Sequence, residues 1–213
     1  MRAVARGAAV TCVVGAFACG ELHGVPGTGD DSDINADAGE NDPPDDAAAG
    51  MSPDAPAAGH RYVFVSATTG VTGGFAGGAD PYAVADGICL RDLFGSSLPN
   101  ARYHAFLKGM QPLQPGVPWY LPSGKMVFDG ATPPTPGANS TPPMSPIQEN
   151  VHGATTGGEH VWTGADGKDC SGWTSSAATS LGGIGDPFSD SAAWDDDMAS
   201  ECAYVHRFYC FEE

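Results

Sequence analysis

The sequence predicts an α+β fold for residues 60–213, with short helices, twisted antiparallel strands, long loops and two disulfides. Three observations indicate this class. The segment combines one helical pattern with several short aromatic and β-branched strand patterns. Stretches rich in proline and glycine separate these patterns, and cysteines are spread among them. The segment is also long enough to bury one hydrophobic core.

The first elements of this segment have clear local signals. A strand is expected at 61–66, where the sequence RYVFVS is aromatic and β-branched. After a glycine-rich turn, a helix is expected to begin at Asp80 and Pro81, because the aspartate can cap free N–H groups and proline suits the first helical position. Gly95 is expected to end this helix. Cys89 lies on the apolar stripe of the helix and is expected to face the core.

Strands are also expected later in the segment. Tyr103–Leu107 and His160–Thr163 are short apolar runs, and 203–211 is an aromatic run near the end of the chain. A hairpin is expected over 119–128, with its turn at Pro122–Gly124.

Two long stretches are expected to be loops. Residues 129–160 are mostly Pro, Gly, Thr and Ser, and 181–200 is rich in Gly, Ser and Asp. Loops of this length inside a compact domain are usually functional or disordered. Both stretches are therefore expected to contact a ligand.

The beginning of the chain resembles an export signal. In residues 1–18, Arg2 and Arg6 form a basic region, and the apolar run that follows is shorter than the roughly 20 residues needed to span a bilayer. The run ends in Ala-Phe-Ala-Cys19, which resembles a bacterial lipobox, in which the cysteine is lipidated after cleavage. The alternative is an ordinary cleaved signal peptide with a chance cysteine at position 19.

Residues 19–59 are expected to form a disordered acidic linker, because they are rich in Pro, Gly, Ala and Asp and contain almost nothing to bury. From the signal and Cys19 we expect the protein to be exported to the cell envelope, as an outer-membrane lipoprotein of a Gram-negative bacterium. Its only contact with the membrane would be the lipid on Cys19.

Charge and cysteine usage bound the function. The chain has 9 Lys and Arg against 26 Asp and Glu, a net charge of −17. Binding to nucleic acid through phosphates requires clustered basic residues, so we expect no nucleic-acid partner. Of the six cysteines, one lies in the signal and one is the lipid site. The other four are Cys89, Cys170, Cys202 and Cys210.

These four cysteines are an even number in an exported chain, which is typical of two disulfides. The number alone leaves three connectivities open. No Cys-x-x-Cys and no Cys/His zinc spacing occurs. Motifs for phosphate loops, dinucleotides and nucleophile elbows are also absent. We therefore expect no enzyme, no catalytic residue and no cofactor, and we expect His206 to be a packed or surface residue.

Six short motifs follow one another along the segment. They are Phe64-Val-Ser66, Gly77-Gly-Ala-Asp80, Tyr103–Leu107, Val161–Gly164, Cys170–Thr174 and Tyr209–Glu212. In this order they resemble a family of bacterial exported domains of unknown function, related to the C-type-lectin-like fold and to endostatin. The resemblance implies a C-type-lectin-like fold over 60–213. It also implies that a cysteine of the first helix pairs with one on the last strand, which gives Cys89–Cys210 and Cys170–Cys202.

The same resemblance raises a calcium site as an alternative. In calcium-dependent lectins of this fold, an Asn and an Asp after a Trp are calcium ligands, and Asp195 and Asp196 follow Trp194 here. The Glu-Pro-Asn or Gln-Pro-Asp that completes such sites is missing before Cys170. We therefore expect Asp195 to Asp197 to be a solvated acidic loop rather than a metal site.

The sequence thus favours a non-catalytic binding module, displayed on a lipid-anchored stalk, with a glycan or protein ligand on the envelope or outside the cell. Its candidate ligand residues are Trp173, Trp194, Asp195 and Asp196, although packing in the core is the first role expected of the two tryptophans. One alternative is a structural or accessory envelope lipoprotein without a small ligand. A second is a calcium-dependent lectin.

Overall fold

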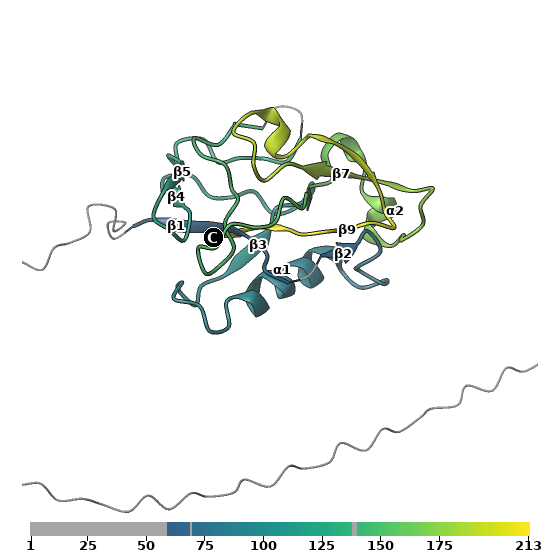
Figure 1. The fold of residues 1–213 in the computed structure, drawn as a ribbon, viewed down its shortest axis with the longest axis horizontal. Helices are drawn as coiled ribbons and strands as arrows, with labels where there is room; N and C mark the ends of the chain where they lie inside the picture. The colour runs from purple at the N-terminus through teal and green to yellow at the C-terminus, as the bar shows by residue number, and fades with distance from the viewer. Residues whose placement is uncertain (1–58, 69, 138–139) are drawn as a thin grey trace, which may run out of the picture. The chain divides into compact units, whose positions relative to one another are not determined.

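The computed structural model describes residues 59–68, 70–137 and 140–213 (Figure 1). The expected signal peptide (1–18), the lipidated Cys19 and nearly all of the acidic linker lie outside the described residues. The described part is a mixed α+β fold, with few short helices, several sheets and two disulfides.

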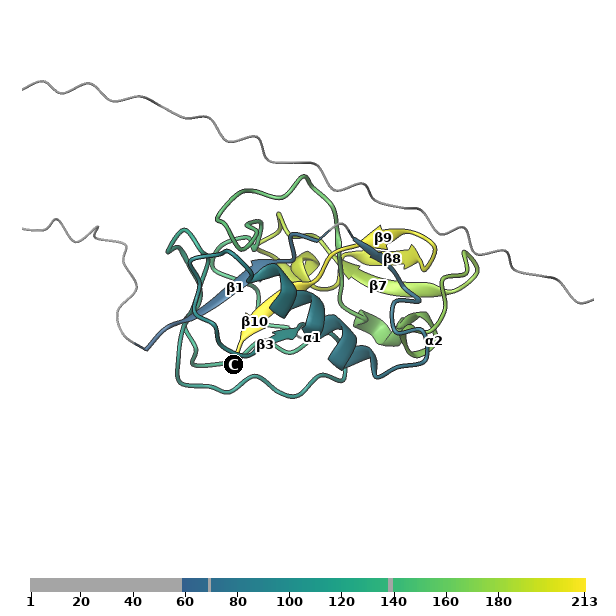
Figure 2. The same cartoon turned by 90° about the horizontal axis from the view of Figure 1, so that it is seen from below.

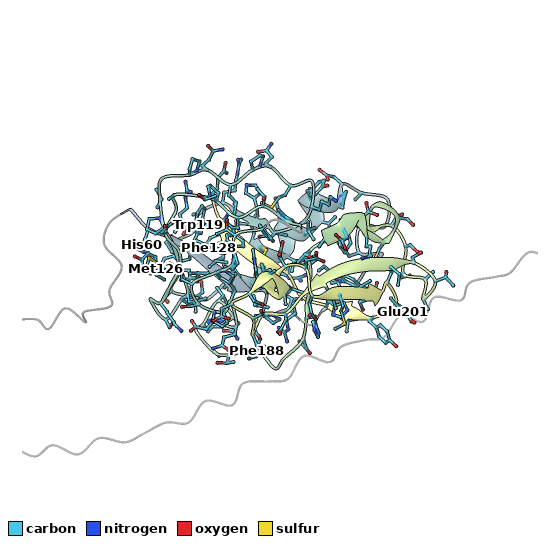
Figure 3. The ribbon with its side chains drawn as sticks, turned by 90° about the horizontal axis from the view of Figure 1, so that it is seen from above. His60, Trp119, Met126, Phe128, Phe188 and Glu201 are labelled. Atoms are coloured by element: carbon cyan, nitrogen blue, oxygen red, sulfur yellow. A yellow bond between two sulfur atoms is a disulfide. The ribbon has the colours of Figure 1, made fainter. Side chains whose placement is uncertain are left out.

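A five-stranded sheet brings the first and last strands together. In spatial order its strands are β3 (Tyr103–Ala105), β10 (Tyr209–Glu212), β1 (Arg61–Val65), β4 (Trp119–Tyr120) and β5 (Met126–Phe128). Strand β10 pairs antiparallel with both of its neighbours, and β1 pairs parallel with β4. Figure 3 shows Trp119 and Phe128 close together, in agreement with their register as partners on β4 and β5.

The sheet is buried on both faces. Successive side chains of a strand point to opposite sides, and each side packs in its own hydrophobic cluster. Phe64 and Cys210 belong to one hydrophobic cluster, together with residues of the helix. Their neighbours Val65 and Tyr209 belong to a second cluster on the other side. This double burial explains why β1 is a continuous apolar run instead of an alternating one.

Helix α1 (Pro81–Asp92) begins as its sequence predicts. The Asp80 side chain accepts a hydrogen bond from the Tyr82 N–H at 3.1 Å, and Pro81 occupies the first turn. The helix buries Ala85, Ile88 and Cys89, and it packs against β3 (Figure 2). Its position beside the sheet creates the groove described below.

A second group of elements contains two smaller sheets. One sheet has the order β6 (Val161–Trp162), β7 (Leu181–Gly185) and β8 (Met198–Glu201), and the other pairs β2 (Val71–Thr72) with β9 (Val205–His206). The helical turns are η1 (Ala165–Gly167), α2 (Cys170–Trp173) and η2 (Ala192–Trp194). Gly73 packs so closely on this group that a Cβ there would lie 2.1 Å from the Cys170 sulfur. A side chain at that position would therefore displace the disulfide.

Several predictions from the sequence are confirmed. The first strand, the helix start at Pro81 and the hairpin over 119–128 are all present. The 129–160 segment contains no helix or strand among its described residues, apart from the isolated bridge between Glu149 and Thr155. It is nevertheless anchored, since the Glu149 carbonyl accepts the Val65 N–H at 2.7 Å and Ile147 is buried.

The prediction that 181–200 is a loop is wrong. This stretch forms β7, η2 and β8. The sequence LGGIG of β7 gives little strand signal because glycine has no side chain that could alternate. In the fold these glycines are needed, because a Cβ at Gly182 would lie 2.5 Å from the Trp162 ring.

The last strand is also divided, where one strand was expected over 203–211. The structure has β9 and β10, with Arg207 and Phe208 between them. The Arg207 carbonyl accepts the Trp162 N–H at 2.9 Å, and its guanidinium donates to the carbonyls of Ser66 and Ala67. These bonds direct the chain from the two-stranded sheet into the five-stranded sheet.

Candidate functional site

The two tryptophans proposed as ligand residues are buried in different places. Trp173 is 2% exposed and packs on Phe75, with ring centroids 5.3 Å apart. Trp194 is 0% exposed and packs on Phe106 at 4.9 Å, in the other hydrophobic cluster. The structure does not bring them together, and neither offers a ring face to a ligand.

Asp195 is not part of a solvated loop, so that expectation is wrong for this residue. It is only 1% exposed, and its Oδ2 accepts the Gly137 N–H at 2.8 Å. Its Oδ1 has no hydrogen-bond partner among the described residues. Burial raises the pKa of the Asp195 carboxyl to about 7. The carboxyl therefore faces inward and fastens the 129–160 segment to the domain.

The three consecutive aspartates have separate surroundings. Asp196 and Asp197 are partly exposed, and the Asp197 carboxylate lies 3.2 Å from Nε2 of His160. Within the part of the chain that the structure describes, no three His, Cys, Asp or Glu side chains gather closely enough to hold a metal ion. The Asp195 carboxyl is thus buried and the Asp196 carboxyl partly exposed, so the two do not form a shared set of ligands for a metal ion.

All four cysteines of the described residues form disulfides. Cys89 is bonded to Cys210 with Cα atoms 5.6 Å apart, and Cys170 to Cys202 with Cα atoms 5.7 Å apart. The pairing implied by the resemblance is therefore confirmed. No thiolate is left at these positions for nucleophilic chemistry.

One serine and one histidine form a close contact near β9. The Ser200 hydroxyl lies 2.7 Å from Nε2 of His206, whose ring packs edge-on against Trp162. Burial lowers the pKa of His206 to about 4, so the neutral ring can accept the hydroxyl proton as a hydrogen bond. Among the described residues no carboxylate bonds to the other nitrogen of His206, so the orienting member of a catalytic triad is missing. The pair is a packing contact, as expected for His206.

An open groove of about 420 Å³ lies between α1 and β3. Two of its lining residues are paired: Nδ1 of His104 lies 2.8 Å from Oδ2 of Asp86. The second carboxylate oxygen of Asp86 accepts the Ala105 N–H at 2.8 Å. The residues that line the groove are Asp80, Tyr82, Ala83, Asp86, Leu90, Arg102, Tyr103, His104, Gly109, Met110 and Gln111.

Charged groups at one side of the groove are connected to this pair. Oε2 of Glu213 lies 3.1 Å from the Arg102 guanidinium and 3.4 Å from Nε2 of His104. The hydrogen bond from Arg102 lowers the pKa of the Glu213 carboxyl. Asp86, His104, Glu213 and Arg102 thus form a continuous polar chain from the helix to the rim.

Another lining residue of the groove, Tyr82, is fitted against a turn. The Tyr82 hydroxyl donates to the Lys108 carbonyl at 3.0 Å. The next residue, Gly109, has a φ of +89°, and a Cβ there would lie 2.3 Å from the Tyr82 oxygen. Glycine is therefore required for the tyrosine to lie in this position.

A second hollow, of about 310 Å³, adjoins the groove at Leu90, which lines both. Leu93 and Leu98 line it, as does Phe94, which is 92% exposed. The groove and this hollow therefore adjoin beside α1 and share Leu90 as a common wall.

Comparison with known proteins does not assign the chain to a family. No family model matches it, and no curated protein matches it either. In addition, no helix of the described residues is long and apolar enough to cross a membrane. The function is therefore inferred from the geometry of the chain itself.

Proposed function

We propose that residues 60–213 form a non-catalytic binding domain of an exported envelope protein, with a glycan or protein ligand. The observation that carries this proposal is the groove beside α1. Its polar groups are already oriented by hydrogen bonds inside the protein, as in preformed ligand sites. The Asp86 carboxylate, the Tyr82 hydroxyl and Nδ1 of His104, which are the kinds of group that act as nucleophiles or bases in enzymes, are already engaged in hydrogen bonds inside the protein.

We also propose the C-type-lectin-like fold for this domain. Three findings support it. The first and last strands are neighbours in one sheet, and the cysteine of the first helix is bonded to the last strand. The second disulfide closes the segment that precedes the last strand. The two disulfides agree with the pairing that the sequence motifs imply.

Export and display complete the proposal. Disulfides form and persist in oxidising compartments, which supports a signal peptide at residues 1–18. The lipid on Cys19 would hold the chain to the outer membrane of a Gram-negative bacterium, and the acidic linker at 19–59 would separate the domain from the membrane. We propose no cofactor and no nucleic-acid partner, since the net charge is −17.

The proposal is tested by saturable binding of the oxidised, labelled full chain to two immobilised fractions of bacterial envelope, polysaccharide and solubilised protein. Saturable binding to one fraction, without turnover on a panel of ester, glycoside and phosphoester substrates, is the expected result. Turnover on that panel would show an enzyme instead. If the chain binds neither fraction, the alternative of a structural or accessory envelope lipoprotein is favoured.

A further inference from the structure

We infer that the groove between α1 and β3 binds a neutral saccharide, an inference that rests on the proposed binding function. None of the proposed ligand residues Trp173, Trp194, Asp195 and Asp196 lines the groove, and Trp194 packs in the hydrophobic cluster on the other side of the sheet from α1. Its volume of about 420 Å³ lies in the range typical of small-ligand sites, roughly 300–1,000 Å³.

The hydrogen-bonding groups of the groove suit hydroxyls. A carboxylate can only accept, so Nδ1 of His104 donates its hydrogen to Asp86. The other ring nitrogen, Nε2, lies 3.4 Å from the Glu213 carboxylate, so both ring nitrogens face acceptors of the protein itself. The Gln111 side chain, which can both donate and accept, has no hydrogen bond to other described residues. A sugar hydroxyl can match this amide, since a hydroxyl both donates and accepts.

The charges of the groove favour a ligand without charge. Both oxygens of Asp86 already accept hydrogen bonds, and Asp80 is engaged in capping the helix. Arg102 is paired with Glu213. The groove therefore offers neither an unpaired cation to an anion nor a cluster of free carboxylates to a metal. The net charge of −17 would in addition repel acidic glycans.

Apolar surface is available for the C–H faces of sugar rings. Tyr82, Leu90 and Met110 line the groove, and packing against them removes apolar surface from water. Leu90 also lines the neighbouring hollow, where Phe94 is 92% exposed. An oligosaccharide that fills the groove can therefore extend past Leu90 and pack on the Phe94 ring. Longer saccharides should bind more tightly than short ones for this reason.

The test uses the oxidised full chain on an array of neutral and acidic oligosaccharides of increasing length, followed by titration with the best soluble neutral compound. The test variants are Gln111→Ala and Phe94→Ala, whose side chains are exposed, so that their removal leaves no cavity in the core. The matched control is Gln114→Ala, an exposed glutamine that does not line the groove. Melting temperatures verify that each variant is folded.

We expect neutral saccharides to bind, with at least a tenfold loss of affinity in Gln111→Ala and no loss in Gln114→Ala. Phe94→Ala should weaken long oligosaccharides but not short ones. Equal binding by all variants would overturn the groove as the site while leaving the binding function in place. Binding of acidic glycans alone would overturn the neutral ligand. Saturable binding to envelope protein without any saccharide signal would overturn the saccharide site but keep the binding function. If the chain binds neither the polysaccharide nor the protein fraction of the envelope, both the saccharide site and the binding function are overturned.

Discussion

Cys89 on α1 is covalently bonded to Cys210 on β10, and 121 residues separate them in the chain. The bond therefore fixes the helix to a strand that lies between β1 and β3. Because His104 belongs to β3 and Asp86 to α1, the same bond holds the two walls of the groove together. The disulfide thus links the stability of the fold to the geometry of the candidate site.

Removal of this disulfide should destabilise the domain strongly. Cys89→Ala combined with Cys210→Ala should lower the free energy of unfolding by about 2–5 kcal/mol, since a long loop is no longer closed. Urea unfolding of the oxidised full chain measures this change. The comparison pair, Cys170→Ala with Cys202→Ala, opens a loop of only 32 residues and should cost about 1 kcal/mol less. Unchanged unfolding of the first pair would contradict the stabilising role.

Asp195→Asn should make the protein less sensitive to pH. The carboxyl has a pKa of about 7 in the folded state, above its ordinary value of 3.8, so the folded state binds more protons between these pH values. Its contribution to stability is therefore fully present below about pH 4 and is lost as the pH rises through about 7. Asparagine does not titrate, and it can still accept the Gly137 N–H.

The expected result is a variant that equals the wild type near pH 4 and is more stable at pH 8 by at least about 1 kcal/mol, or about 2–4 °C in melting temperature. Thermal unfolding across this pH range measures the difference, which cancels the contributions of other titrating groups. Asp190→Asn, at an exposed position, is the control and should show no such trend. A wild-type advantage at pH 8 would mean that the Asp195 carboxylate is stabilised in the fold.

Calcium should leave the melting temperature of the full chain unchanged relative to EDTA. A ligand that binds only the folded state must raise this temperature. The inward carboxyl of Asp195 and the missing cluster of acidic side chains in the described residues give no reason for such binding. A calcium-dependent rise that disappears in Asp196→Ala would establish a calcium-dependent lectin in place of the proposed domain.

Gly109→Ala should disturb the wall of the groove. The substitution places a Cβ 2.3 Å from the Tyr82 oxygen and strains a backbone with a φ of +89°. Gly116→Ala is a matched control, because its φ is +97° but nothing lies within 4 Å of its Cβ. In both variants, backbone strain should lower the free energy of unfolding by about 1–3 kcal/mol. Only Gly109→Ala should lose more than this, as measured by urea unfolding, and equal losses would argue against a tight fit of Tyr82.

Local signals predicted a large part of this fold. Asp80 and Pro81 define the start of α1, and the apolar run of β1 gives a buried strand. Strand β7 could not be predicted, because glycines give no strand pattern. The reason for glycine at Gly182 is its close contact with Trp162 and Cys170, which exists only after folding. The burial of Asp195 was equally hidden, since a run of aspartates has the composition of a solvated loop.

The groove could not be predicted from local patterns either. Asp86 and His104 are 18 residues apart, one on a helix and the other on a strand, and neither belongs to a recognisable motif. Their contact arises only when α1 packs against β3. The disulfide pairing, in contrast, could be predicted, but only from the resemblance of the ordered short motifs to a family. The number of cysteines alone leaves three pairings open.

NMR of the histidine ring signals in the full chain, during titration with a neutral oligosaccharide, measures most directly whether a saccharide binds in the groove. His104 lines the groove, whereas His152 is exposed on the 129–160 segment and His206 packs on Trp162. Binding in the groove predicts saturable shifts of the His104 signals, while those of His152 and His206 stay in place. Saturable shifts at His152 or His206 with an unchanged His104 would place the ligand elsewhere and contradict a saccharide site in the groove.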